Sequence, residues 1–296
     1  MPPRGFRQGT TAVVAWHGDA HTRDMAVESA LVSDGFEAFT PEHALLLVLL
    51  AAGAIALGMT GNRQRRRGDA LRFRRRFAAL IPVFTLPFQV LQLLPGDFTL
   101  GTSLPLQVCD LSWMVAVWAL WTRDARAIAL LYFWALVLDV QAAVTPSLGQ
   151  TFPDPRYFMF WGMHFLTIWA AVYLVCLAGG PTWRDYRFTM ACTAVWAATV
   201  MVFNAVTGTN YGYLSRKPET SSLLDLLGPW PAYVGAEVAI LAGVWAAMTW
   251  PWVRARHLAT PARSAAGPSA GGALPAGADE HAAGEQGAEA GGQQQR

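Results

Sequence analysis

Charged residues are scarce in the sequence: Asp, Glu, Lys and Arg together make up 14% of its 296 residues. A soluble domain usually carries about a quarter charged residues. Lysine occurs once, as Lys217, in a stretch that we assign to a connecting loop. Because a retinal Schiff base needs a lysine inside the membrane, this position excludes a rhodopsin and its retinal. The net charge of +2 gives no indication of nucleic-acid binding.

Cysteine is also scarce, with three residues and no CxxC or zinc-type spacing. Neither a disulfide framework nor a structural metal is indicated. His43, Cys109, His164 and an aspartate could together supply metal ligands, but no pair of them has the i, i+4 spacing of a helical metal site. We therefore predict no metal and no cofactor.

Hydrophobic residues, in contrast, make up 53% of the chain and come in long blocks. The blocks are about 18–22 residues long, the length at which a helix spans the ~30 Å hydrocarbon core. The sequence thus predicts an all-α polytopic membrane protein with seven transmembrane helices. The expected spans are about 43–60, 77–94, 104–122, 127–145, 157–178, 187–206 and 229–250.

Arginine sets the expected orientation. The stretch NRQRRRGDALRFRRRF, which links the first two spans, holds eight arginines and one aspartate, so the positive-inside rule predicts that it is cytoplasmic. The later basic loops alternate in agreement, and the loops 95–103 and 146–156 carry only Arg156. The N-terminus is then outside and the C-terminus cytoplasmic.

Three segments follow from this topology. Residues 1–40 form a polar, extracytoplasmic segment without the features of a signal peptide, and Met25 is an alternative start. Residues 41–252 form the seven-helix domain. Residues 253–296 are rich in Ala, Gly and Gln and should be a disordered cytoplasmic tail. The Arg-, Ala- and Gly-rich composition suggests a GC-rich genome, and we expect a multi-pass protein of the bacterial plasma membrane.

The ionisable residues inside the expected spans all fall in the outer half. At 1.5 Å per residue, Cys109 lies about 8 Å deep, His164 about 10 Å and Glu237 about 12 Å. The other polar residues of this half are Asp110, Asp139, Gln141 and Asn204, with His43 at the outer mouth. Charged groups in a bilayer are costly and usually face the bundle interior. We infer a polar cavity that opens towards the outer leaflet.

Each of these residues also has a structural interpretation. Cys109 alone is more often an apolar filler, as Cys176 and Cys192 are expected to be. His164 could form an interhelical hydrogen bond, and Asp110 could pair with Gln107 on one helix face. Glu237 could pair across helices. Together, however, a Cys and a His at matched depth with carboxyl groups nearby are the set that thiolate chemistry requires.

The outer loop 204–231 is the other unusual stretch. Gly208 and Gly212 permit tight turns, and Asn210 can hold its own turn by side-chain hydrogen bonds. The segment LLDLLGPWP predicts a short interfacial helix that stops at Gly228. The loop is either an ordinary connector or a lid over the cavity, in which case Asn210 should point inward near Asp110 or His164.

The residues also resemble a known family. The motifs FEAFTPEH, LPLQVCDLS, YFWALVLDVQAAVTP, YFMFWGMHF and GTNYGYLSRKP…SLLDLLGPWPAY are similar in order and spacing to those of YwaF-type bacterial integral membrane proteins, over about 36–252. These are related to a eukaryotic transmembrane lipid acyltransferase. The resemblance implies a seven-helix fold and acyl transfer carried by a cysteine and a histidine, here Cys109 and His164. Gln107 stands where the family usually has histidine, and Asp139 where a small residue is usual. If the missing histidine is the general base of the family, this protein would either be impaired or use His164 or His43 instead.

The first functional hypothesis is Cys/His-dependent acyl transfer or hydrolysis on phospholipids. Cys109 attacks the ester, His164 takes the thiol proton, and Asp110 or Asp139 orients the imidazole. Gln107, Asn204 or Asn210 donates to the oxyanion. The expected substrate-binding residues are His43, Gln107, Asp139, Gln141, Asn204, Asn210, Tyr211 and Glu237. The alternative is a non-enzymatic protein that binds or transports a lipid or small solute, although no internal repeat and no polar path to the inner face supports a transporter. In either case membrane lipids are the expected partners.

Overall fold

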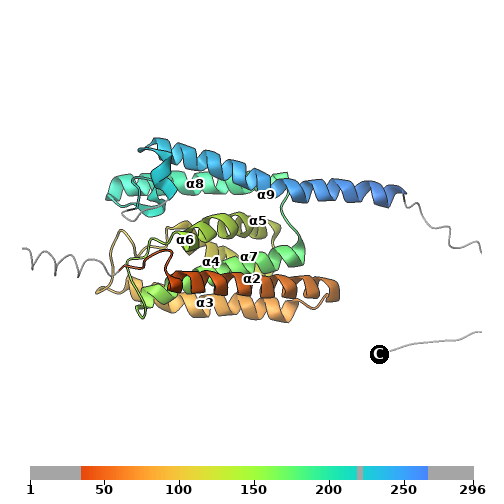
Figure 1. The fold of residues 1–296 in the computed structure, drawn as a ribbon, viewed down its shortest axis with the longest axis horizontal. Helices are drawn as coiled ribbons and strands as arrows, with labels where there is room; N and C mark the ends of the chain where they lie inside the picture. Colours follow the sequence, from red (N-terminus) through yellow and green to blue (C-terminus); the bar gives the residue numbers. More distant parts are fainter. Residues whose placement is uncertain (1–34, 219–222, 266–296) are drawn as a thin grey trace, which may run out of the picture. The chain divides into compact units, whose positions relative to one another are not determined.

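The computed structural model describes residues 35–218 and 223–265. The chain divides into two compact units, 1–255 and 256–296, and the second is described only as far as the last helix continues into it. Within the described ranges every regular element is helical (Figure 1). The longer helices are α2 (Pro41–Arg67), α3 (Leu71–Leu93), α4 (Val108–Thr122), α7 (Pro155–Ala178), α8 (Trp183–Thr207) and α9 (Ala232–Ala265). The fourth expected span consists of α5 (Ala125–Phe133), the π-helical turn η1 (Trp134–Asp139) and α6 (Val140–Val144), and the outer loop holds two short 3₁₀ helices, η2 (Tyr211–Tyr213) and η3 (Leu223–Leu227).

In the part of the chain that the structure describes, six helical segments are long and apolar enough to cross a membrane. They are α2, α3, the run from α5 to α6, α7, α8 and α9. The third expected span is different, because α4 has only 15 residues. At 1.5 Å per residue it is about 22 Å long, shorter than the ~30 Å hydrocarbon core. All seven expected spans therefore correspond to apolar helical segments, and the count of seven transmembrane helices stays a prediction.

Helix boundaries follow from local capping. Thr40 accepts a hydrogen bond from the backbone of His43 and Pro41 occupies the first turn of α2, which ends at Gly68 with a positive φ of 75°. Thr182 and Asp185 form a capping box at the start of α8. These combinations of side-chain cap, first-turn proline and terminal glycine explain why these helices begin and end where they do.

Several helix boundaries differ from the expected ones. The spans expected from about 104 and 229 begin later, α4 at Val108 and α9 at Ala232, so Pro105, Pro229 and Pro231 precede their helices. At the other end, α9 continues to Ala265, beyond the boundary expected at 252. The remaining tail, 266–296, and nearly all of the N-terminal segment lie outside the described residues.

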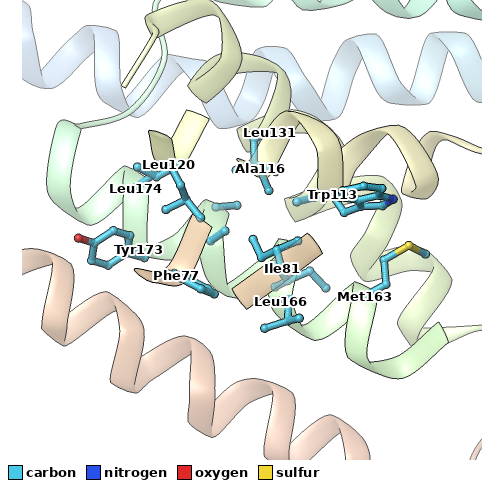
Figure 2. Close-up of a cluster of buried hydrophobic side chains, with 14 of the residues drawn as sticks. Phe77, Ile81, Trp113, Ala116, Leu120, Leu131, Met163, Leu166, Tyr173 and Leu174 are labelled. Atoms are coloured by element: carbon cyan, nitrogen blue, oxygen red, sulfur yellow. The ribbon is translucent and has the colours of Figure 1, made fainter. Parts of the chain in front are cut away.

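The central helix of the core is α7. In its most apolar window 67% of the residues are buried, against 17% for α2, α8 and α9. Figure 2 shows how side chains of α3, α4, α5 and α7 meet in one cluster. Its labelled members are Phe77, Ile81, Trp113, Ala116, Leu120, Leu131, Met163, Leu166, Tyr173 and Leu174. This cluster fixes α4 against α7, which matters for the site below.

Close helix contact on the other side of α7 depends on glycine. A Cβ atom built on Gly61 would lie 2.5 Å from the backbone oxygen of Tyr173, and one on Gly53 would lie 2.2 Å from the indole of Trp169. The same indole donates a hydrogen bond to the backbone of Leu50 at 2.8 Å. Small residues thus let α2 approach α7 to backbone contact, the usual device of membrane helix packing.

Aromatic side chains attach α9 to the bundle. Trp245 packs on Phe133 with ring centroids 5.1 Å apart, and the Trp252 indole donates to the Tyr132 hydroxyl at 3.2 Å. Trp252 also lies directly on Gly180, where a Cβ atom would come within 2.1 Å of the ring. These contacts tie the middle and the later part of α9 to α5.

Candidate functional site

Buried polar side chains gather between α4, η1 and α7. Asp110 and Ser112 come from α4, Asp139 from η1, and His164 and Thr167 from α7, and each is at most 9% exposed. The Ser112 hydroxyl donates to Asp139 Oδ1 at 3.3 Å. Because α4, η1 and α7 contact one another, residues that are distant in sequence share one polar region within an apolar bundle.

Several buried polar atoms of this region lack a partner. Among the described residues, neither Asp139 Oδ2 nor His164 Nε2 has a hydrogen bond, and the indole nitrogens of Trp113 and Trp161 are also buried and unpaired. An unsatisfied buried polar group costs about 1–3 kcal/mol. Unpaired buried polar atoms such as Asp139 Oδ2 and His164 Nε2 are found at sites that bind a ligand or water.

Asp139 is the last residue of the π-helical turn η1. A π turn contains one residue more than an α turn, so it changes the face on which the following residues lie, and such turns are frequent at functional sites. Asp139 is 1% exposed here. No sequence signal had predicted this turn.

The hydrogen bond of His164 determines its tautomer. Nδ1 lies 2.6 Å from the backbone oxygen of Phe160, one turn earlier on α7. A carbonyl oxygen can only accept, so Nδ1 carries the proton, and in the neutral ring Nε2 is then an unprotonated acceptor. Since Nε2 has no partner, it is available to take a proton. We had expected Asp110 or Asp139 to orient this imidazole, but the Phe160 carbonyl does so instead.

Cys109 occupies the first turn of α4 and is half-buried. Backbone N–H groups at the start of a helix have no intrahelical acceptor, and they favour an anion. Cys109 packs against the apolar core cluster that includes residues of α7.

Asp110 has a structural role in the same turn. Its Oδ2 atom accepts the backbone N–H of Gln107 at 3.1 Å, which completes the first turn of α4. The pairing of Asp110 with Gln107 that the sequence offered as an alternative is thus present, between carboxylate and backbone. Through this bond Asp110 helps to fix the position of Cys109.

The outer loop is fastened to the start of α4 by Tyr211, which is 0% exposed. The Tyr211 hydroxyl accepts the Leu104 N–H at 3.0 Å and donates to the Leu100 carbonyl at 2.8 Å. One residue later, the Gly212 N–H donates to Gln107 Oε1 at 2.8 Å. We call this set of contacts between residues 99–107 and 210–214 the loop latch.

Asn204 holds the first residues of the loop by hydrogen bonds of its side chain. Its Nδ2 donates to the Tyr211 carbonyl at 2.9 Å, and its Oδ1 accepts the Tyr211 N–H at 2.9 Å and the Thr209 hydroxyl at 2.8 Å. The positive φ angles predicted for Gly208 and Gly212 are confirmed at 74° and 66°. Both polar atoms of Asn204 are thus used by the fold.

Asn210 differs from one expectation and confirms another. It was expected to point towards Asp110 or His164, but its side chain bonds to the backbone of Ser215 and Arg216 in its own loop. It therefore holds its own turn, as its residue type had suggested. Of the three amides considered as oxyanion donors, only Gln107 has a side-chain nitrogen that makes no hydrogen bond among the described residues; Nδ2 of Asn204 and of Asn210 each donates one.

The rest of the loop is partly packed. The short helix expected before Gly228 is the 3₁₀ helix η3, and Leu224 is buried. Leu226 and Trp230, however, are 83% and 56% exposed. The loop covers the start of α4 mainly through its first half.

His43 is fully buried, and both of its ring nitrogens are bonded. Nδ1 accepts the Phe39 N–H at 2.9 Å, and Nε2 donates to the Ala143 carbonyl at 2.9 Å. Aromatic rings of Phe36 and Trp161 flank it. In this conformation His43 links α2 to α6 and has no free nitrogen for a substrate.

Gln141 and Glu237 are half-buried, and their side chains have no hydrogen-bond partner among the described residues. Glu237 lies four residues before Leu241 and eight before Trp245, which pack into the bundle, so helical spacing puts it on the same face of α9. The structure does not join these two residues to the region around Asp139.

Sequence reasoning did not select three polar residues that the structure emphasises. Ser112 bonds Asp139, Tyr157 donates to Glu42 at 2.5 Å, and the buried Arg74 donates to the Leu120 and Trp121 carbonyls at the end of α4. Ser112 follows Asp110 by two residues and could have been noticed. Arg74 was assigned to the cytoplasmic loop because α3 was expected to begin at 77. Within 35–218 and 223–265, no three His, Cys, Asp or Glu side chains are arranged to hold a metal ion.

Comparison with known proteins adds one finding. The family model of the TMEM164 family matches residues 38–249, more than two thirds of the chain. No curated protein and no solved structure matches. The matched range includes α2 to α8, the outer loop and most of α9.

Proposed function

The chain belongs to the TMEM164 family of transmembrane proteins, and from this premise we propose that it carries out cysteine-dependent acyl transfer or hydrolysis on phospholipids. Cys109 is the nucleophile and His164 the general base. The proposal rests on the side chains described above together with the resemblance to a lipid acyltransferase noted from the sequence motifs.

One observation supports the proposal most directly: His164 has a buried, unprotonated Nε2 without a partner, held by the bond from Nδ1 to Phe160. This arrangement has the logic of a catalytic histidine, in which an acceptor at one nitrogen fixes the tautomer and leaves the other nitrogen as the base. Here a backbone carbonyl replaces the usual carboxylate. A purely structural histidine would be expected to use both nitrogens, as His43 does.

The proposed reaction has two steps. Nε2 of His164 takes the thiol proton while the Cys109 sulfur attacks an ester carbonyl carbon; the ester C–O bond breaks, and the leaving alkoxide receives the proton from His164. The product is a thioester on Cys109 and a lysophospholipid. A second hydroxyl compound or water then attacks the thioester and releases the thiol. No cofactor or oxidant is needed.

Two charged groups form in this reaction, the Cys109 thiolate and the oxyanion of the attacked carbonyl, and the surroundings of Cys109 can stabilise both. Cys109 lies in the first turn of α4, where the backbone N–H groups of a helix start favour an anion. The free side-chain N–H group of Gln107 is the remaining amide candidate for the oxyanion. Asp110 and Asp139 have supporting roles in this proposal. Asp110 completes the helical turn that carries Cys109, and Asp139, which accepts a hydrogen bond from Ser112, is a polar residue of the site.

The membrane setting is part of the same proposal. We infer seven spans with the N-terminus outside and the C-terminus cytoplasmic, so that the site opens towards the outer leaflet of a bacterial plasma membrane. A phospholipid substrate then enters sideways from that leaflet. The short α4 fits this arrangement, because its first turn lies below the surface and the segment 99–107 completes the crossing.

Acyl-enzyme trapping tests the proposal. The full-length protein is reconstituted with a phospholipid that carries an alkyne-tagged acyl chain, and the adduct is detected by its sensitivity to hydroxylamine and mapped by mass spectrometry. We expect a thioester on Cys109, none in Cys109→Ala, and a rate about 10²–10⁴-fold lower in His164→Ala. Cys192→Ala is the matched control and should behave as the wild type. If wild-type protein binds the lipid but never forms the adduct, the chain is a lipid-binding protein and the enzymatic proposal fails.

A further inference from the structure

A cavity lies apart from Cys109 and His164, at the end of the bundle where α7 begins. Its volume is about 210 Å³. By the same measure a single water molecule needs only about 10–15 Å³. The walls come from the end of α3, the following loop and the start of α7. The lining residues are Phe88, Leu91, Gln92, Asp97, Asp154, Pro155, Arg156 and Met159.

The charged residues of this cavity are not paired with each other. Among the described residues the only ion pair joins Lys217 to Asp225, so Arg156 has no salt bridge to Asp97 or Asp154. The Arg156 guanidinium donates one hydrogen bond, to the Asp97 carbonyl at 3.3 Å. A guanidinium has five N–H donors, and most of these remain for a ligand.

Arg156 lies where the topology makes a positive charge unexpected. It is the only positive charge in the stretches 95–103 and 146–156. With the predicted topology these loops are outside, where arginine is disfavoured. An arginine that is kept there and lines a cavity is well suited to bind phosphate.

The balance of charges indicates what kind of phosphate compound fits. One arginine and two aspartates give the lining a net charge of about −1 at neutral pH. A simple anion would be repelled by the carboxylates, and a simple cation by the guanidinium. A zwitterion with a phosphate and an ammonium group satisfies both signs.

The uncharged walls indicate an amphiphile. Phe88, Leu91, Pro155 and Met159 form the apolar part of the lining. Leu91 is 43% exposed on α3, a candidate membrane-spanning helix, so this side of the cavity faces the apolar surroundings of the bundle. The combination of lipid-facing apolar wall and unpaired charges matches a molecule with a charged head and hydrocarbon chains.

We propose that this cavity binds the headgroup of a zwitterionic phospholipid, with the phosphate on Arg156 and the ammonium group on Asp97 and Asp154. The inference depends on the membrane placement of the chain but not on acyl transfer. On α7, Arg156 precedes His164 by eight residues, about 12 Å along the helix. A lipid held here therefore lies near the membrane surface, above the depth of His164.

Lipid titration followed by native mass spectrometry tests the proposal. The full-length protein in detergent is titrated with phosphatidylethanolamine and with phosphatidylglycerol of the same acyl chains, and separately with soluble phosphoethanolamine. The variants are Arg156→Gln and Asp97→Asn; Asp154 is left intact because it caps α7. The matched control is Arg216→Gln, an exposed arginine of the outer loop that does not line the cavity. Thermal melting confirms that each variant is folded.

The wild type should bind phosphatidylethanolamine more tightly than phosphatidylglycerol. Arg156→Gln should weaken phosphatidylethanolamine binding about ten-fold or more, since it removes charge-assisted hydrogen bonds. Asp97→Asn should reduce the preference between the two lipids by strengthening phosphatidylglycerol binding, which a merely damaged cavity cannot do. Arg216→Gln should change neither affinity.

Three results would overturn the proposal: equal affinity of the wild type for both lipids, an Arg156→Gln variant that binds like Arg216→Gln, or binding of phosphoethanolamine as tight as that of the lipid. The third would indicate a site for a soluble ligand. Measured in Cys109→Ala, the lipid preference should persist, so the headgroup site and the acyl-transfer proposal can fail separately.

Discussion

Replacing Tyr211 by Phe tests whether the loop latch holds the start of α4. The change removes one hydroxyl and leaves the ring in place. Two backbone groups lose their partner, the Leu104 N–H and the Leu100 carbonyl. Leu100 is 44% exposed, so water can replace the hydroxyl at its carbonyl, whereas Leu104 is half-buried. Counting only the Leu104 N–H, we expect a loss of about 1–3 kcal/mol in the local stability of the latch.

Hydrogen exchange measures this local stability directly. A loss of about 1–3 kcal/mol corresponds to backbone exchange that is about 5- to 150-fold faster, provided that exchange proceeds through local opening. Peptides covering 99–107 and 208–214 should show the effect, and peptides of α2 should not.

Tyr213→Phe is the matched control, two residues away in the same loop. The Tyr213 hydroxyl has no partner among the described residues, and only its backbone carbonyl is used, by the Tyr233 hydroxyl. This variant should exchange like the wild type. If Tyr211→Phe does so too, the hydroxyl bridge contributes nothing, and the latch must depend on ring burial and on Asn204 alone.

Two further predictions address topology and helix packing. A reporter fused after Arg67 should read cytoplasmic and one inserted at Gly149 should read external; the opposite result for both would invalidate the depth argument. Gly61→Ala should destabilise the protein by about 1–3 kcal/mol, because its Cβ would lie 2.5 Å from the Tyr173 oxygen. The control Gly243→Ala, where a Cβ meets nothing within 4 Å, should be neutral or stabilising in the same denaturant titration, and equal effects of the two changes would refute the close-packing argument.

Much of the helical arrangement could be predicted from the sequence. The apolar blocks located the seven longer apolar segments because membrane helices must be long and apolar, and this requirement leaves few alternatives. Boundaries were less well predicted, since hydrophobicity does not stop where a helix stops. Leu104, Pro105 and Leu106 are apolar, yet they form an irregular segment because their backbone is bonded by distant side chains, such as Tyr211 to Leu104 and Trp196 to Leu106.

The sequence allowed the residues of the candidate site to be selected, but not the contacts that these residues make. Cys109, Asp110, Asp139 and His164 could be selected because polar groups in apolar spans are costly. Their partners could not, because each depends on a local detail. The imidazole of His164 bonds the carbonyl of its own preceding turn, a contact open to any histidine on a helix. The face on which Asp139 lies depends on the π-helical turn η1, which no feature of the surrounding apolar sequence predicts.

The contacts of Gln107 suggest why the outer loop and the cysteine belong together. Its backbone N–H bonds the Asp110 carboxylate within the first turn of α4, and its side-chain oxygen accepts the Gly212 N–H of the loop. Gln107, two residues before Cys109, is therefore held both by its own helix and by a segment about a hundred residues later in the chain. Loosening of the latch would release the turn that presents the Cys109 sulfur and the free amide of Gln107 at the same time. On the mechanism proposed above, the loop would control the geometry of the site without contributing a reacting group, and Asn204, Asn210 and Tyr211 would be positioning residues instead of ligands of the substrate.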